Sequence, residues 1–101
     1  MREYKCNMGI CYLAPSDKDE KEKNEIIEKQ TQLFEEEIQR KFGLMAEVVS
    51  VEPYDLEEAS KLSMSVSCFI PDAIPEQEIE ATLREILLSL NVEDYGIEKK
   101  N

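Results

Sequence analysis

Few side chains in this sequence could do chemistry: the chain holds three cysteines and has no histidine. Without histidine, the Ser–His and Cys–His nucleophile pairs of most hydrolases are excluded. Cys6 and Cys11 have a spacing that a metal-binding pair could use, but side chains five residues apart on a strand point to opposite faces. We therefore expect Cys6 and Cys68 to be buried structural thiols, and Cys11 to be a more exposed thiol without a cationic neighbour.

Carboxylates are abundant, but their spacing matches no metal site. Asp17, Asp19 and Glu28 coincide with the first, third and twelfth positions of an EF-hand calcium loop. Lys21 then stands where an acidic ligand is needed, and Glu22 stands where the loop needs glycine. The three glycines are isolated, which excludes a Gly-rich phosphate loop. We expect no bound cofactor and no metal.

An enzymatic role would need a pair of carboxylates that act as general acid and base. Glu57 and Glu93 form one such candidate pair. Nothing distinguishes them from the other 21 of the 23 acidic residues in the chain. The sequence therefore predicts a protein that is not an enzyme.

The charge of the chain indicates the kind of partner it would bind. Asp and Glu number 23 against 12 Lys and Arg, which gives a formal net charge of -11 and a pI near 4.4. Such a surface repels nucleic-acid phosphates and anionic lipid heads and attracts basic proteins and cations. We therefore expect a basic protein partner, no direct binding of nucleic acid and no membrane association. Solubility alone is the alternative explanation of the acidity.

Length and composition indicate one soluble domain. A chain of 101 residues can bury one hydrophobic core, so we expect a single domain over 1–101. The odd number of cysteines and the absence of a secretory pattern at the start favour a reduced, cytoplasmic setting. No window approaches the roughly 18 consecutive apolar residues of a membrane-spanning helix.

Periodicity predicts the first three elements. Alternation over 4–12 predicts a strand, and an apolar stripe from Ile26 to Phe42 predicts a long helix that ends at Gly43. The segment 17–25 has nothing to bury and is expected to be either solvated helical turns or a loop. Residues 44–52 predict a second strand that ends at 53–55. Which side of this strand faces the core stays undecided, because its odd and even positions are both mostly apolar.

The second half of the chain repeats this order. Alternation over 61–70 predicts a third strand, with Ser63, Ser65 and Ser67 on one side. Pro75 is expected to begin a second helix, and 95–99 to form a short last strand.

The resulting order βαββαβ resembles the split βαβ, or ferredoxin-like, arrangement. We therefore expect an α+β fold of two layers, an antiparallel sheet with two helices on one face. The resemblance also implies that the first and third strands are central. It carries almost no functional information, because many unrelated functions share the fold.

This topology would bring three connections to one end of the sheet, and these connections are rich in acid. The residues expected there, and predicted to bind a partner, are Asp17, Asp19, Glu20, Glu52, Asp55, Glu57, Glu58, Glu93 and Asp94. Arg40 and Lys41 are expected at the opposite end. The sequence thus predicts a bipolar domain with one strongly acidic end.

Three hypotheses compete for this acidic end. In the first, the domain inhibits or regulates a basic nucleic-acid-binding protein by mimicking nucleic acid, as small inhibitors of phage or mobile elements would. In the second, the acidic loops bind a divalent cation. In the third, the domain is a self-associating or assembly subunit that uses the Ser-rich sheet face with Phe69, or an edge strand, and the acid only keeps it soluble.

Overall fold

A computed structural model describes residues 2–11, 20–54, 61–90, 92 and 94–100 of the chain. Within these ranges the elements are strand β1 (Arg2–Cys11), helix α1 (Glu20–Phe42), strands β2 (Glu47–Tyr54) and β3 (Lys61–Ile70), helix α2 (Glu76–Ser89) and strand β4 (Asp94–Lys99). The order βαββαβ is as predicted, and the short last strand forms.

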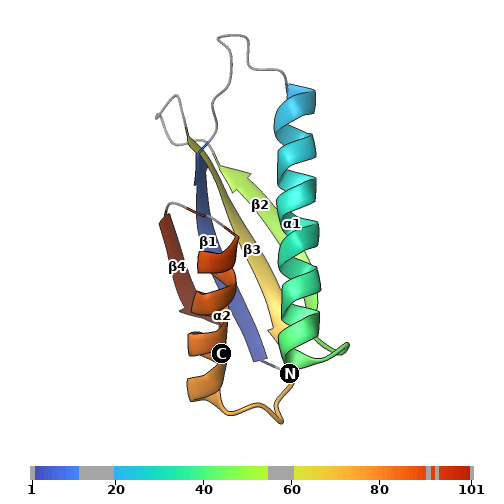
Figure 1. Cartoon of the computed structure of the whole chain (residues 1–101), viewed down its shortest axis with the longest axis vertical. Helices are drawn as coiled ribbons and strands as arrows, with labels where there is room; N and C mark the ends of the chain where they lie inside the picture. Colours follow the sequence, from blue (N-terminus) through green and yellow to red (C-terminus); the bar gives the residue numbers. More distant parts are fainter. Residues whose placement is uncertain (1, 12–19, 55–60, 91, 93, 101) are drawn as a thin grey trace.

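The strands form one antiparallel sheet in the order β2-β3-β1-β4. Both helices cover the same face of this sheet, and neither of these described helices lies over the other face (Figure 1). The fold is therefore the predicted α+β, ferredoxin-like arrangement. The central strands β1 and β3 are also the two whose alternation is cleanest in the sequence.

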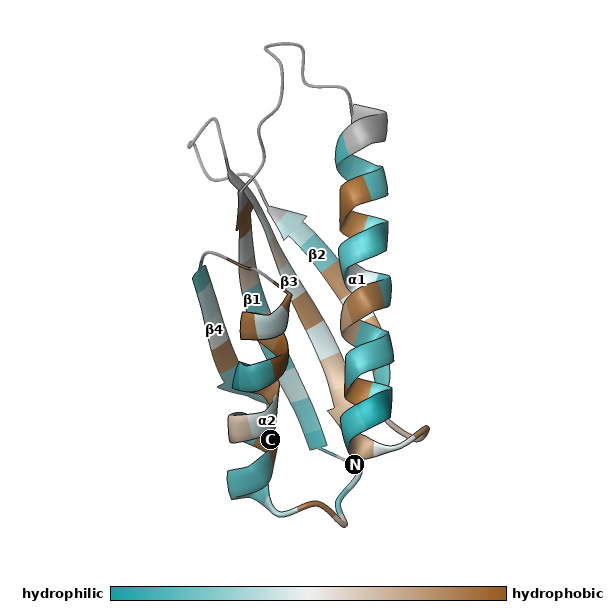
Figure 2. Cartoon of the chain, in the orientation of Figure 1, coloured by the Kyte–Doolittle hydropathy of each residue, from teal (hydrophilic) through white to brown (hydrophobic). Residues whose placement is uncertain are grey.

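The hydrophobic core lies between the helices and the apolar face of the two central strands. Each large apolar side chain buried there contributes about 1.5–3 kcal/mol to stability. Hydrophobic and hydrophilic bands alternate along α1, as expected for a helix with one buried side (Figure 2). The buried core consists of Tyr4, Cys6, Met8, Phe34, Ile38, Ala46, Met64, Val66, Cys68, Ile70, Ile79, Leu83, Ile86 and Leu87.

Helix α1 begins at Glu20, so part of the segment expected to be either solvated turns or a loop is helical. The helix buries Phe34 and Ile38 and ends before Gly43, as predicted. Gly43 has a φ of 102°, and its N–H donates a hydrogen bond of 2.9 Å to the carbonyl of Gln39. This left-handed residue is what allows the chain to leave α1 and turn into β2.

Helix α2 follows Pro75, which occupies the position just before the helix, and Glu76 and Glu78 lie in its first turn. The two helices meet where Gln30 Nε2 donates a 3.5 Å hydrogen bond to the carbonyl of Leu90. This contact joins the two helices on one side of α1. Edge strand β2 lies on the other side of α1.

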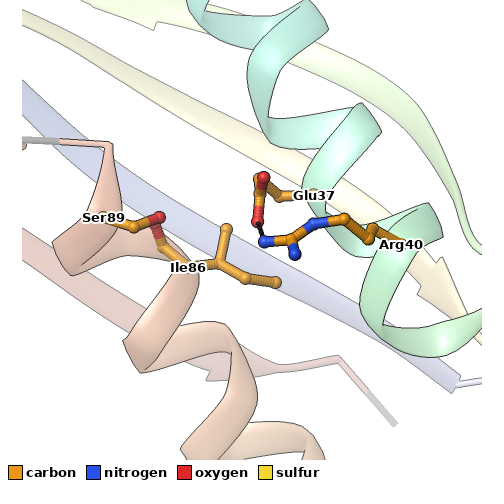
Figure 3. Close-up of polar contacts among 4 residues, drawn as sticks. All are labelled: Glu37, Arg40, Ile86 and Ser89. Atoms are coloured by element: carbon orange, nitrogen blue, oxygen red, sulfur yellow. Dashed lines mark hydrogen bonds and ion pairs between the residues drawn. The ribbon is translucent and has the colours of Figure 1, made fainter.

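Figure 3 shows the space between the two helices, into which side chains of both helices project. On α1, Arg40 Nη2 lies 2.6 Å from Glu37 Oε2, an ion pair one helical turn apart. On α2, Ser89 Oγ donates a 2.7 Å hydrogen bond to the carbonyl of Ile86. The predicted cationic residue Arg40 is therefore partly neutralised within its own helix.

Edge strand β2 begins and ends later than predicted: the sequence predicted a strand over 44–52, and the structure has Glu47–Tyr54. The strand therefore includes Pro53, which was expected to end it. Proline lacks an N–H and is tolerated on an edge strand, where that donor is not needed by a neighbour. Its presence removes one hydrogen-bond donor from this strand.

A bulge in β2 settles the facing that the sequence left open. The register shifts between Val48 and Ser50, so that Val48 and Val51 both pack against the core. The extra residue, Val49, remains 42% exposed. Apolar residues occur at both odd and even positions because the extra residue of the bulge changes which positions face the core.

Replacing Gly43 with alanine should destabilise the protein, because a Cβ is strained at a φ of 102° even though no atom lies within 4 Å of it. We expect a loss of about 1 kcal/mol in the free energy of unfolding, measured by urea denaturation.

Gly96→Ala is the matched control. Its Cβ would meet Asn7 Nδ2 at 3.7 Å, an ordinary contact, and we expect no loss of stability there. Equal losses at both positions would contradict the role assigned to the left-handed turn.

Candidate protein-binding site

The sheet brings the ends of several elements to one end of the molecule. Asp94, Gly9, Ser63 and Tyr54 lie in one row across β4, β1, β3 and β2. At this end β1 and β2 finish, β3 and β4 begin, and α1 starts nearby (Figure 1). The convergence on which the acidic-end hypothesis depends is thus a feature of the fold.

Two of the predicted binding residues can be placed fully. Glu52 lies opposite Ser65 and Asp94 lies opposite Gly9, so both are on the sheet face away from the helices, and both are exposed. Their strands are the two edges of the sheet, about 14 Å apart at three strand spacings.

The other predicted residues are only partly placed or lie outside the description. Glu20 is the first residue of α1, near the same end of the molecule. The remaining six lie outside the described residues: Asp17, Asp19, Asp55, Glu57, Glu58 and Glu93.

On the open sheet face the serines are buried, whereas the hypothesis of self-association requires them to form a contact surface. Ser63, Ser65 and Ser67 are only 1%, 6% and 7% exposed, although no helix covers them. Ser65 Oγ donates a 2.6 Å hydrogen bond to Asn7 Oδ1 on the neighbouring strand. The serines therefore form the floor of this face, and larger neighbours such as Lys5, opposite Ser67, form its accessible surface.

Acidic side chains also lie along the two edges of this face. Glu47 and Glu52 are exposed on β2, and Glu98 is exposed on β4. Lys100 Nζ lies 3.7 Å from Glu3 Oε2, a partly exposed pair that offsets one of the acids. The open face is thus polar and mainly acidic at its rim.

The structure adds a groove that sequence reasoning missed. It has a volume of about 340 Å³, lies between α1 and edge strand β2, and is lined by Ile27, Glu28, Thr31, Gln32, Glu35 and Val51. Its surface is mostly apolar, and its charged members are both carboxylates. The groove thus combines an apolar floor with two carboxylates and no basic side chain.

Glu35 has a structural role within this groove. Its Oε2 accepts a 3.0 Å hydrogen bond from the backbone N–H of Val48, next to the bulge. The carboxylate thereby occupies a donor of the edge strand. The signal for this groove in the sequence is the spacing of Glu28, Thr31 and Glu35 on one side of a helix, but the position of β2 beside them requires the bulge.

The opposite edge of the molecule has mixed charge. Lys99 Nζ lies 2.5 Å from Glu76 Oε1, and this ammonium group lowers the pKa of Glu76. Arg2 Nη1 donates a 3.0 Å hydrogen bond to the carbonyl of Ile74. Near the β4 edge Lys99 thus offsets Glu76, whereas the described part of β2 carries Glu47 and Glu52 and no basic residue.

Two of the three thiols are buried, as the sequence predicted. Cys6 and Cys68 are both buried, and the side chain of Cys11 is outside the description. Hydrogen bonding to Cys68, followed by burial, raises the pKa of Cys6 far above its ordinary value. Burial, followed by the charge of Glu76, raises the pKa of Tyr4, whose hydroxyl is buried without a hydrogen-bond partner. Neither group is a nucleophile at neutral pH.

Two further searches of the described residues bear on function. No group of three or more Cys, Asp or Glu side chains among them is arranged to hold a metal ion. None of the described helices has both the length and the apolar character needed to cross a bilayer.

Comparison with known proteins shows a shared fold. No protein-family model matches the chain, and no curated protein matches it by sequence. A putative amidohydrolase/peptidase from Burkholderia cenocepacia matches with 18% identity and a TM-score of 0.52, over 99% of this chain but 27% of that one.

Two other solved structures match with lower TM-scores. A de novo designed protein with a ferredoxin fold has 11% identity and a TM-score of 0.47, over 99% of this chain and 84% of that one. A structural-genomics protein, YJCS, has 17% identity and a TM-score of 0.39, over 98% and 99% of the two chains. At these identities the likeness concerns the fold alone.

The raised pKa values predict that stability falls at alkaline pH. Cys6 and Tyr4 keep their protons in the folded state, whereas the unfolded chain releases them near pH 8.5 and pH 10. The contribution of Cys6 is therefore complete below about pH 8 and is lost as pH rises further, and that of Tyr4 is lost only above about pH 10.

Urea denaturation of wild type and Cys6→Ala between pH 8 and pH 10 measures this effect. We expect the slope against pH to be shallower in Cys6→Ala than in wild type, whatever its stability at pH 8. Parallel slopes would show that Cys6 ionises in the folded protein as it does in the unfolded chain.

The hydrogen bond from Val48 predicts that Glu35→Ala and Glu35→Gln differ. Alanine removes the acceptor at a partly buried site, which should cost about 1 kcal/mol of stability. Glutamine keeps an oxygen acceptor and should be within about 0.5 kcal/mol of wild type. Thermal or urea unfolding measures both, and equal stability of all three proteins would mean that the bond contributes nothing.

Proposed function

We propose that this protein is a non-catalytic binding module that recognises a basic protein partner through carboxylates at one end of its sheet. The observation that carries the proposal is the convergence of acid-bearing strand and helix ends, with Glu52 and Asp94 exposed on the same face. A concentrated negative field at one end of a small domain steers and orients a positively charged partner.

A nucleic-acid-binding protein is the partner class that this arrangement fits best. A basic nucleic-acid groove is built to receive an array of negative charges, and a rigid sheet can present such an array on both of its edges. Occupying this groove would exclude the nucleic acid. The role that we propose is therefore inhibitory or regulatory, by mimicry of nucleic acid.

Self-association through the Ser-rich face is the weaker candidate. The serines there are at most 7% exposed and so offer little surface for contact. Two copies would also bring together surfaces of the same sign, since each chain carries a net charge of -11. The burial of the serines and this repulsion both favour a partner of opposite charge.

Capture from a cell lysate tests the proposed function. A variant in which Asp55, Glu57, Glu58, Glu93 and Asp94 are replaced by Asn or Gln should lose a basic partner that wild type captures at low salt and releases at high salt. Mass spectrometry of the captured proteins measures this loss.

The matched control neutralises five exposed acids elsewhere, Glu36, Asp72, Glu78, Glu80 and Glu85, and changes the net charge equally. It should keep most of the binding. Loss of the partner in both variants would attribute binding to net charge, and unchanged binding in the first variant would refute the acidic end as the contact.

A further inference from the structure

We propose that the groove between α1 and β2 is a docking site for a basic amphipathic helix of the partner. This inference rests on the proposed function and locates a second contact of the same binding event. Ile27 and Val51 supply an apolar floor, and Glu28 and Glu35 supply charge on its α1 side. The occupant is therefore a segment with an apolar side chain flanked by Lys or Arg.

Edge strand β2 is poorly suited to pair with an added strand of a partner. This argues against the other way in which a partner could bind at this edge, which is backbone pairing. The bulge at Val49 breaks the ladder, Pro53 lacks an N–H, and Glu35 occupies the N–H of Val48. A partner must therefore bind here by side-chain contacts along α1 instead of by backbone pairing with β2.

The spacing of the acids indicates a helical partner. Glu28 and Glu35 are seven residues apart on α1, a rise of about 10.5 Å over two turns. A helix lying along α1 matches this rise with basic residues seven positions apart, and it places apolar residues three and four positions after the first of them between the two acids. An apolar side chain at this place lies next to Thr31, and Ile27 lies one helical turn before Thr31 on α1.

The charge around the groove favours a basic partner over a second copy of this chain. Neither Lys nor Arg is among the six residues of the groove, and its two charged residues are both Glu. A helix from another copy would bring further acid to this edge, because each copy has a net charge of -11.

The test uses the full chain and a fluorescent helical peptide as probe. The peptide has two Lys residues seven positions apart and Leu at the third and fourth positions after the first Lys. Fluorescence anisotropy at low salt should show saturable binding to wild type. Replacing both Lys by Glu, or both Leu by Ser, should remove it. Absence of binding to wild type would overturn the proposal.

Two double variants locate the contact. Glu28→Gln with Glu35→Gln keeps the acceptor for Val48 and should weaken binding of the peptide about tenfold. Glu25→Gln with Glu36→Gln changes the same charge at exposed positions of α1 that do not line the groove, and it should bind within about twofold of wild type. Equal weakening in both variants would overturn the groove as the site.

The two proposals fail separately in these experiments. In one outcome, lysate capture depends on the sheet-end acids while Glu28→Gln with Glu35→Gln changes neither that capture nor binding of the peptide. This result would leave the proposed function standing and would overturn the groove as a docking site. Loss of lysate capture in the control variant removes the proposed function whatever the peptide does.

Discussion

The pairing of β1 with β3 is the interaction on which the rest of this structure depends. These two central strands run antiparallel over ten residue pairs, from Arg2 with Ile70 to Cys11 with Lys61. In this register the apolar residues of both strands share one face, and the Ser and Asn residues share the other. A shift of one residue would place the core side chains in water, so the register is fixed by burial.

The one-sided sheet in turn determines where charge can lie. Both helices must cover the apolar face, and the buried interior leaves no room for unpaired carboxylates. None of the described Asp or Glu residues is therefore buried. Lys99 and Lys100 offset Glu76 and Glu3 near β4, whereas β2 carries Glu47 and Glu52 and no basic residue.

The sequence predicts the fold well because its signals are local. Alternation over Leu62–Ile70 and the stripe on α1 each depend on neighbouring residues, and Gly43 marks the end of α1 by its own conformation. The facing of β2 was not predictable, because a bulge at Val49 is a property of its pairing with β3. The extent of serine burial likewise depends on flanking strands.

The proposed binding surface was predictable only in part. The convergence of strand ends follows from topology, and the sequence placed Glu52 and Asp94 correctly at that end. The groove at α1 was missed, since Glu35 and Val48 are 13 residues apart and meet only when β2 folds beside the helix. Contacts of this kind need the register of an edge strand, which no local pattern supplies.

Site-specific photo-crosslinking tests most directly the claim that a basic partner binds at the acidic end and the β2 edge. A photoreactive residue is placed at position 52, on β2 at the sheet end, or at position 85, on the exposed side of α2. The account predicts that basic proteins in a lysate crosslink to position 52 at low salt, lose that crosslink at high salt, and do not crosslink to position 85. Equal crosslinking at the two positions, or crosslinking only at position 85, would contradict it.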